Sequence, residues 1–128
     1  MTDPEKTRWV RYAADCAERV LGMTDQYRPQ AEAAIRAARK WVDDPTSEQA
    51  RACQQAVIAL DHVTDPASVS AATMAAVSAA FAAEAAYSQY SVALVGYVEH
   101  MAARASWDPS ERAWQSERRR FYGLEAKP

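Results

Sequence analysis

Cys16 is the side chain in this sequence best placed to act as a nucleophile, because Asp15, Glu18 and Arg19 stand within three positions of it. A neighbouring base or cation can activate a thiol for covalent catalysis. Cys16 also lies seven residues after Trp9, a spacing that places both side chains on the buried face of one helix. Buried cysteines usually pack as small, unreactive apolar groups. We therefore favour a structural thiol here over a catalytic one.

The charged neighbours of Cys16 form a second feature of this segment, which has two interpretations. Asp15, Glu18 and Arg19 occupy positions i, i+3 and i+4, so a helix would place them on one face, beside a seam of alanines. One interpretation is structural, with an ion pair inside the helix and one bridge to a neighbouring helix. The other is functional, with these charges forming the edge of a groove or contacting a partner.

Metal and phosphate chemistry have little support. The two histidines, His62 and His100, fall on different predicted helices, and neither belongs to the short His and Glu spacings that hold metals on helices. The second cysteine, Cys53, is far from Cys16 in the sequence. Three isolated glycines cannot build a phosphate-binding loop. We expect neither a metal nor a cofactor.

Three tyrosines, Tyr87, Tyr90 and Tyr97, repeat at the spacing of an inward-facing helical stripe. The simpler interpretation is that their rings fill the core against alanines of neighbouring helices. The alternative is an aromatic pocket between helices, with Glu84 beside it, since helical bundles commonly hold ligands at such positions.

The chain carries one run of three basic residues, Arg118, Arg119 and Arg120, near its carboxyl end. Cations at the end of a helix complement its dipole, so we favour a solvated helix end over contact with an anionic partner. The net charge of −2 and the pI of about 5.7 do not suggest binding to nucleic acid or to an anionic membrane.

Helices must position all these side chains, because the chain holds 29 alanines and only 3 glycines in 128 residues. Alanine is the best helix former, whereas sheets need β-branched residues and turn glycines. Asp-Pro pairs occur four times, and each is typical of a helix start, because aspartate caps the first turn and proline needs no hydrogen-bond partner there. The predicted helices cover residues 4–21, 29–42, 46–63 and 109–122, with Gly22 and Gly123 as C-caps.

Residues 66–105 form one further helical pattern, in which Glu84 is the only formal charge before residue 99. A single helix of this length would measure about 58 Å, more than the roughly 36 Å diameter of a compact chain of this size. We therefore predict a break within residues 88–91 and two helices surrounded by others. Glu84 is expected to pair with an arginine such as Arg19 or Arg51.

Length and pattern together predict a single all-α domain over residues 1–128, a bundle of five or six helices. Residues 1–8 contain no apolar run typical of a secretory leader, and two isolated cysteines suit a reducing compartment. We expect a cytoplasmic protein. Alanine and serine dominate residues 66–105 and Glu84 interrupts them, which argues against a membrane span.

Motifs in the first half of the chain are more specific than its composition. Residues 9–21 read WVRYAADCAERVL, an Arg-Pro pair at residues 28–29 opens the next helix, and residues 34–42 read AIRAARKWV. With the alanine-rich half that follows, the chain resembles the bacterial immunity protein family associated with polymorphic toxin systems, over about residues 8–105. The resemblance implies a non-enzymatic helical protein that protects its host by binding a cognate toxin or a toxic small molecule.

Two sets of residues are therefore candidates for binding. For a partner or ligand of an immunity or self-resistance protein, the candidates are Asp15, Glu18, Arg19 and Arg28, with Trp9 and Trp41 behind them. The alternative function is a small-molecule-binding or biosynthetic accessory protein, or an enzyme, with a pocket formed by Glu84, Tyr87, Tyr90 and Tyr97. A homodimer that associates through residues 66–105 is a further structural hypothesis.

Overall fold

Six α-helices make up the part of the chain that the computed structural model describes, which comprises residues 4–21, 27–63, 71–89, 91–106 and 110–124. No β-strand occurs in these ranges, so the predicted all-α bundle is confirmed with the larger of the two expected helix numbers. None of the helices described is long and apolar enough to cross a membrane. The helices are α1 (Pro4–Leu21), α2 (Arg28–Asp43), α3 (Ser47–Val63), α4 (Ala71–Tyr87), α5 (Ser91–Ser106) and α6 (Ser110–Phe121).

Local signals in the sequence determine where helices begin and end. The backbone N–H of Gln49 donates to Oγ1 of Thr46 at 3.2 Å, so Thr46 is the N-cap of α3 and the helix begins two residues after Pro45. Beyond α6, Gly123 has a φ of +71°, the left-handed conformation of a glycine C-cap. Four other predicted cap residues lie outside the described part of the chain: Asp3, Gly22, Asp65 and Asp108.

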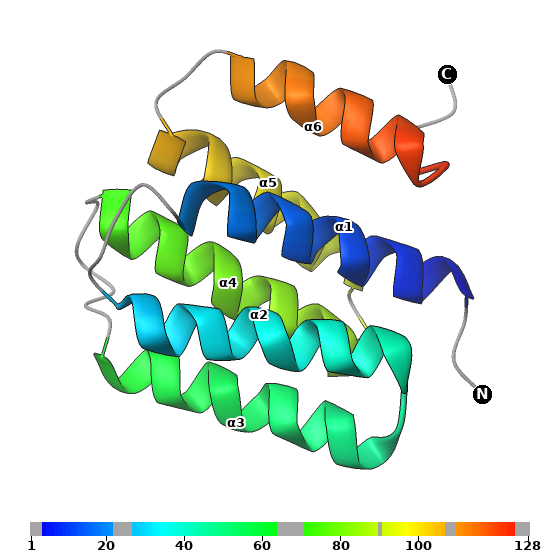
Figure 1. Cartoon of the computed structure of the whole chain (residues 1–128), viewed down its shortest axis with the longest axis vertical. Coiled ribbons are helices and arrows are strands. Elements are labelled where there is room, and N and C mark those ends of the chain that lie inside the picture. The colour runs from blue at the N-terminus through cyan, green and yellow to red at the C-terminus, as the bar shows by residue number, and fades with distance from the viewer. Residues whose placement is uncertain (1–3, 22–26, 64–70, 90, 107–109, 125–128) are drawn as a thin grey trace.

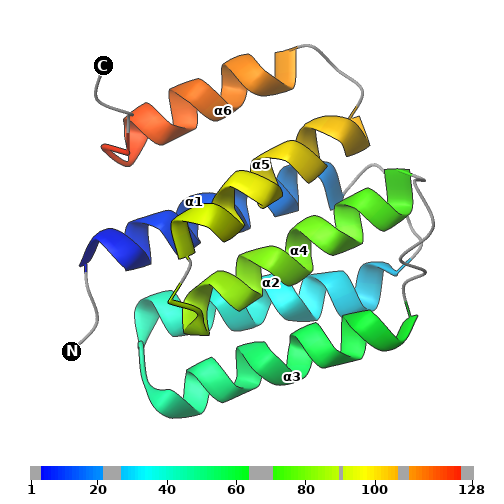
Figure 2. The same cartoon turned by 180° about the vertical axis from the view of Figure 1, so that it is seen from behind.

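The long neutral segment is two helices, as the length argument predicts. The first helix, α4, ends at Tyr87 and the second, α5, begins at Ser91, which confirms the expected break. The two helices lie side by side in Figure 2, so the chain folds back on itself instead of projecting from the bundle.

The bundle has two layers. Figure 1 shows α1, α2 and α3 in the front layer, with α4 and α5 behind them, and Figure 2 shows the same layers from the other side. Four helices pack against α4, namely α1, α2, α3 and α5, so the alanine-rich helix is the central one, as expected. The last helix, α6, lies along the edge made by α1 and α5 and runs antiparallel to α1 (Figure 1).

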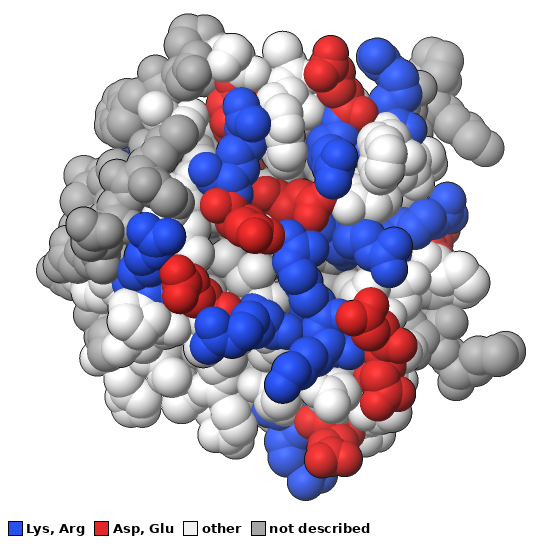
Figure 3. Space-filling model, in the orientation of Figure 1, with Lys and Arg blue, Asp and Glu red and all other residues white. Residues whose placement is uncertain are grey.

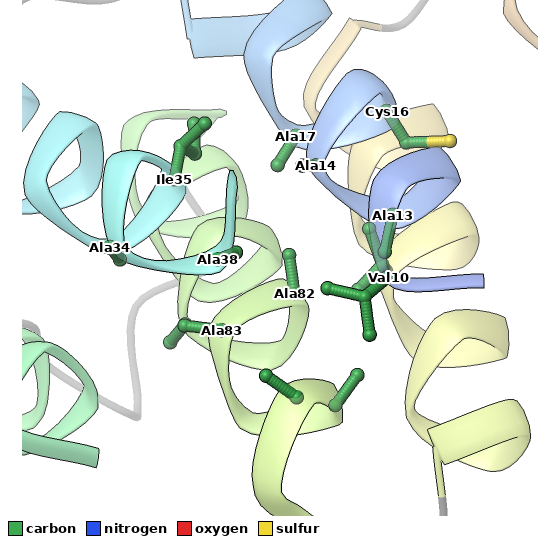
Figure 4. Close-up of a cluster of buried hydrophobic side chains, with 14 of the residues drawn as sticks. Val10, Ala13, Ala14, Cys16, Ala17, Ala34, Ile35, Ala38, Ala82 and Ala83 are labelled. Carbon is green, nitrogen blue, oxygen red and sulfur yellow. The ribbon is translucent and has the colours of Figure 1, made fainter. Parts of the chain in front are cut away.

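Small side chains fill the contact between α1, α2 and α4 (Figure 4). Alanine methyl groups from all three helices meet there, and nearly all of them are fully buried. Because the distance between packed helices depends on the side chains at the contact, alanine allows these backbones to come close together. The labelled alanines in this contact are Ala13, Ala14, Ala17, Ala34, Ala38, Ala82 and Ala83.

Candidate functional site

An open groove of about 450 Å³ runs between the end of α1 and the part of α2 from Arg28 to Arg39. Two buried apolar side chains, Leu21 and Ile35, lie in it. Two of the residues predicted to bind a partner, Glu18 and Arg28, also line it. The remaining lining residues, which the sequence analysis did not single out, are Glu32, Arg36 and Arg39.

Most of the charged side chains in this groove form ion pairs. Nε of Arg28 pairs with Oε1 of Glu32 at 2.8 Å, one turn further along α2. Arg39 bridges to Glu18 on α1. Arg36 is exposed and has no carboxylate within ion-pair distance among the residues described. The groove therefore combines an apolar base with one arginine, Arg36, that has no ion-pair partner among the described residues.

A second, smaller hollow of about 170 Å³ adjoins the first, because Arg39 lines both. Its other lining residues are Arg11, Val42 and Asp43. Arg11 is exposed and, like Arg36, has no carboxylate partner in the described ranges. Figure 3 shows basic and acidic side chains interleaved over this face, with the basic ones gathered towards its centre.

Asp15 joins three helices instead of pairing within its own. Its Oδ1 accepts a hydrogen bond from Arg39 of α2 at 3.0 Å, and its Oδ2 accepts one from Nε of Arg118 of α6 at 2.8 Å. The hydroxyl of Tyr122 also donates to Oδ2, at 2.6 Å. The predicted ion pair inside the helix is wrong, because Arg19 points to α6 as well. Asp15, Glu18 and Arg19, which share one face of α1, therefore form ion pairs with α2 and α6.

The contact of Arg19 with α6 combines charge and aromatic packing. Nε of Arg19 lies 2.7 Å from Oε2 of Glu111, which is almost fully buried. The guanidinium also lies 4.5 Å from the centre of the Trp114 ring. Arg19 is therefore a structural residue of the α1–α6 contact, and it does not line the α1–α2 groove.

Glu99, on α5, is the centre of a buried polar network that the sequence analysis missed. Tyr12 donates its hydroxyl hydrogen to Oε2 of Glu99, and Arg119 donates to both carboxylate oxygens, with Nε 2.7 Å from Oε2. Gln115 donates to the backbone carbonyl of Glu99 at 3.0 Å. Burial, the nearby Cys16 and Glu99 itself hold the pKa of Tyr12 well above its usual value, so Tyr12 remains a donor.

The basic run is therefore not a solvated helix end, which corrects the prediction for its first two members. Arg118 pairs with Asp15 and Arg119 with Glu99, whereas Arg120 is exposed. Phe121, the last residue of the same helix, is 70% exposed. No sequence signal distinguishes these outcomes, because three consecutive arginines carry no local mark of which of them meets a partner helix.

The two tryptophans that were predicted to lie behind the binding residues are buried beneath charged side chains. Trp9 lies beneath Arg119, whose guanidinium is 5.1 Å from the ring centre. Trp41 is covered by Lys6, whose Nζ is 5.5 Å from its ring. Neither ring lines the α1–α2 groove, so both support the candidate surface from within.

The predicted tyrosine pocket is not formed as expected. Tyr97 is 55% exposed and packs against the ring of Phe81 at 5.6 Å between centres, so its inward position is wrong. Tyr87 is half-buried against the core. Tyr90 lies outside the described residues. The helices α1, α4 and α6 all pack against α5, yet the ring of Tyr97 meets α4 through Phe81 and stays largely exposed.

Glu84 has no arginine partner within the described part of the chain, so its predicted pairing with Arg19 or Arg51 is wrong. Arg19 is engaged by Glu111 instead. Glu84 lines a cavity of about 230 Å³ between α3 and α4, and neither Tyr87 nor Tyr97 lines it.

Both cysteines are buried and free. Burial raises the pKa of Cys16 to about 12 and that of Cys53 to about 11, so both remain thiols. His62 and His100 are exposed on separate helices. No three His, Cys, Asp or Glu side chains gather to hold a metal ion in the ranges that the structure describes.

Thiol chemistry gives a direct check of this arrangement. We expect neither Cys16 nor Cys53 to react with Ellman's reagent at pH 8 in the folded protein, and both to react in guanidinium chloride. Because both pKa values are raised from an ordinary value of 9.0, the unfolded chain loses these protons first. The free energy of unfolding should therefore fall as the pH rises from about 9 towards 12. A Cys16→Ala variant should show a shallower fall, and an unchanged slope would contradict the raised pKa.

Comparison of the chain with protein-family models, with curated proteins and with solved structures gives no match.

Proposed function

We propose that this protein is a non-enzymatic binding protein that protects its host cell by neutralising a cognate toxin, and that the α1–α2 groove contacts that toxin. The observation that carries the proposal is the combination of Arg36, which has no carboxylate partner among the described residues, with the buried apolar pair Leu21 and Ile35. Arginine and apolar side chains are the groups that most often dominate the energetics of a protein interface.

The motifs of the immunity family support the same location. Residues 9–21 and 34–42, which carry the resemblance, belong to α1 and α2, the two helices that line the groove. Inhibition by binding needs shape and charge complementarity and no catalytic group. The inert environment of Cys16 is in keeping with such a role.

The groove favours an acidic segment of the toxin as the bound element. A carboxylate can accept two parallel hydrogen bonds from the guanidinium of Arg36. An adjacent apolar side chain can cover Leu21 and Ile35. Such a contact weakens with salt because part of its attraction is long-range.

The test uses the product of the gene adjacent to this one, which the proposal predicts to be toxic. We expect coexpression of the two proteins to restore growth, and an Arg36→Glu variant to bind that protein roughly 10- to 100-fold more weakly, about 1.4–2.8 kcal/mol. The matched control is Arg104→Glu on α5, which reverses an equally exposed charge away from the groove. Isothermal titration calorimetry measures both variants. Equal binding by Arg36→Glu and the unmodified protein would contradict the groove, and a neighbouring gene without a toxic product would contradict the immunity function.

Two other hypotheses were raised by the sequence: a small-molecule-binding protein and a homodimer. A small-molecule-binding protein gains support from the cavity beside Glu84, although neither Tyr87 nor Tyr97 lines it. The homodimer through residues 66–105 stays a prediction, and the exposed Val92 and Tyr97 are the residues of α5 that a second copy would cover.

A further inference from the structure

The cavity between α3 and α4 combines apolar walls with carboxylates, as a small binding site would. Its volume is about 230 Å³, and its walls are mostly apolar, with two carboxylates among them. Val57, Leu60 and Asp61 come from α3, and Val77, Ala80, Phe81 and Glu84 come from α4. The ring of Phe81 is held from outside by Tyr97, at 5.6 Å between centres.

The electrostatics of this cavity are unfavourable in the free protein. Glu84 is half-buried, and both burial and the nearby Asp61 raise its pKa above the usual value. Neither Asp61 nor Glu84 has a cation within ion-pair distance among the described residues. The other titratable groups that act near Glu84 are Tyr87, whose pKa is raised to about 12 by burial and by Glu84, and the buried Cys53. Tyr87 and Cys53 are neutral at pH 7.5, so the repulsion is between Asp61 and Glu84, and a cation in the cavity would relieve it.

The size of the cavity limits what the cation can be attached to. Pockets for drug-sized ligands measure roughly 300–1,000 Å³, and this one is smaller. It has room for a group about as large as one side chain.

We propose that the α3–α4 cavity binds the ammonium end of a small apolar amine, with the cation at Asp61 and Glu84 and the apolar part against Val57, Leu60 and Phe81. The amine is either a free small molecule or the side chain of a lysine on a partner protein. This site shares no residue with the α1–α2 groove, so the amine-binding proposal does not depend on the toxin-binding proposal.

The experiment compares three probes of similar size: butylammonium, 1-butanol and butyrate. Each is titrated into the ¹⁵N-labelled full chain at pH 7.5, and ¹H–¹⁵N correlation spectra follow the backbone amides. We expect butylammonium to shift amides of α3 and α4 and to bind at least 10-fold more tightly than 1-butanol, with no binding of butyrate. Glu84→Gln should weaken butylammonium roughly 10-fold. The matched control is Glu48→Gln, an exposed carboxylate at the start of the same helix α3, which should leave affinity unchanged.

Two outcomes would overturn the proposal. One is equal affinity for butylammonium and 1-butanol. The other is unchanged affinity in a Glu84→Gln variant whose circular dichroism and Tm match those of the unmodified protein. A lysine-derived probe, N-acetyl-lysine methylamide, separates the two sources of the amine: binding as tight as that of butylammonium indicates a partner's lysine, and weaker binding indicates a free amine.

Discussion

Replacing Glu99 by alanine is expected to lower the free energy of unfolding by about 3 kcal/mol. The change leaves the hydroxyl of Tyr12, which is fully buried, without an acceptor, at a cost of about 1–3 kcal/mol. It also removes the charge-assisted hydrogen bonds from Arg119, each worth about 1.5–3 kcal/mol and not fully additive with the first loss. Urea denaturation followed by circular dichroism measures the effect.

The network around Glu99 also attaches α6 to the bundle. Amide hydrogen exchange should therefore accelerate in α6 before it does in α4 when Glu99 is replaced. The matched control is Glu117→Ala, an exposed carboxylate on α6, which should change stability by no more than about 0.5 kcal/mol. Similar losses in the two variants would show that the buried network contributes little.

Enlarging Ala82 to leucine should be nearly as damaging, with a loss of up to about 3 kcal/mol. Ala82 is fully buried on α4, the helix that packs against four others. Extra methyl groups there have no free volume to enter, so the helices must separate or the side chain must leave its preferred rotamer. The Tm from a thermal scan reports the loss.

The same substitution at an exposed alanine separates packing from helix propensity. Ala113→Leu, on the solvent side of α6, should change the Tm little, because leucine and alanine are both strong helix formers. An Ala82→Leu variant as stable as Ala113→Leu would mean that α4 is less tightly enclosed than its burial indicates.

Much of the fold is predictable because it depends on local rules. The break between α4 and α5 follows from the length of residues 66–105 set against the size of a compact chain. The ends of α1 and α6 follow from proline and glycine positions. Burial of Trp9 and Cys16 follows from their spacing on one helix.

The candidate site was only partly predictable. Glu18 and Arg28, both candidates from the sequence, line the α1–α2 groove, but Arg36, the arginine on which the toxin-binding proposal rests, was not a candidate. Glu84 was expected beside a tyrosine pocket, but it lines a cavity with Asp61 and Phe81, and neither Tyr87 nor Tyr97 is among the lining residues. Each of these errors concerns a contact between helices.

The sequence by itself determined that this chain is helical, where its helices begin and end, and which helix is rich enough in alanine to lie at the centre. These properties depend on backbone propensity, caps and periodicity within a few neighbouring residues. Only the tertiary structure decided that Asp15 holds α2 and α6, that Glu99 is paired with Arg119, and that Arg36 and Glu84 are left without partners among the described residues. The physical reason is that a charge is neutralised by whichever opposite charge the packing of helices brings within reach, and that neighbour is distant in the sequence.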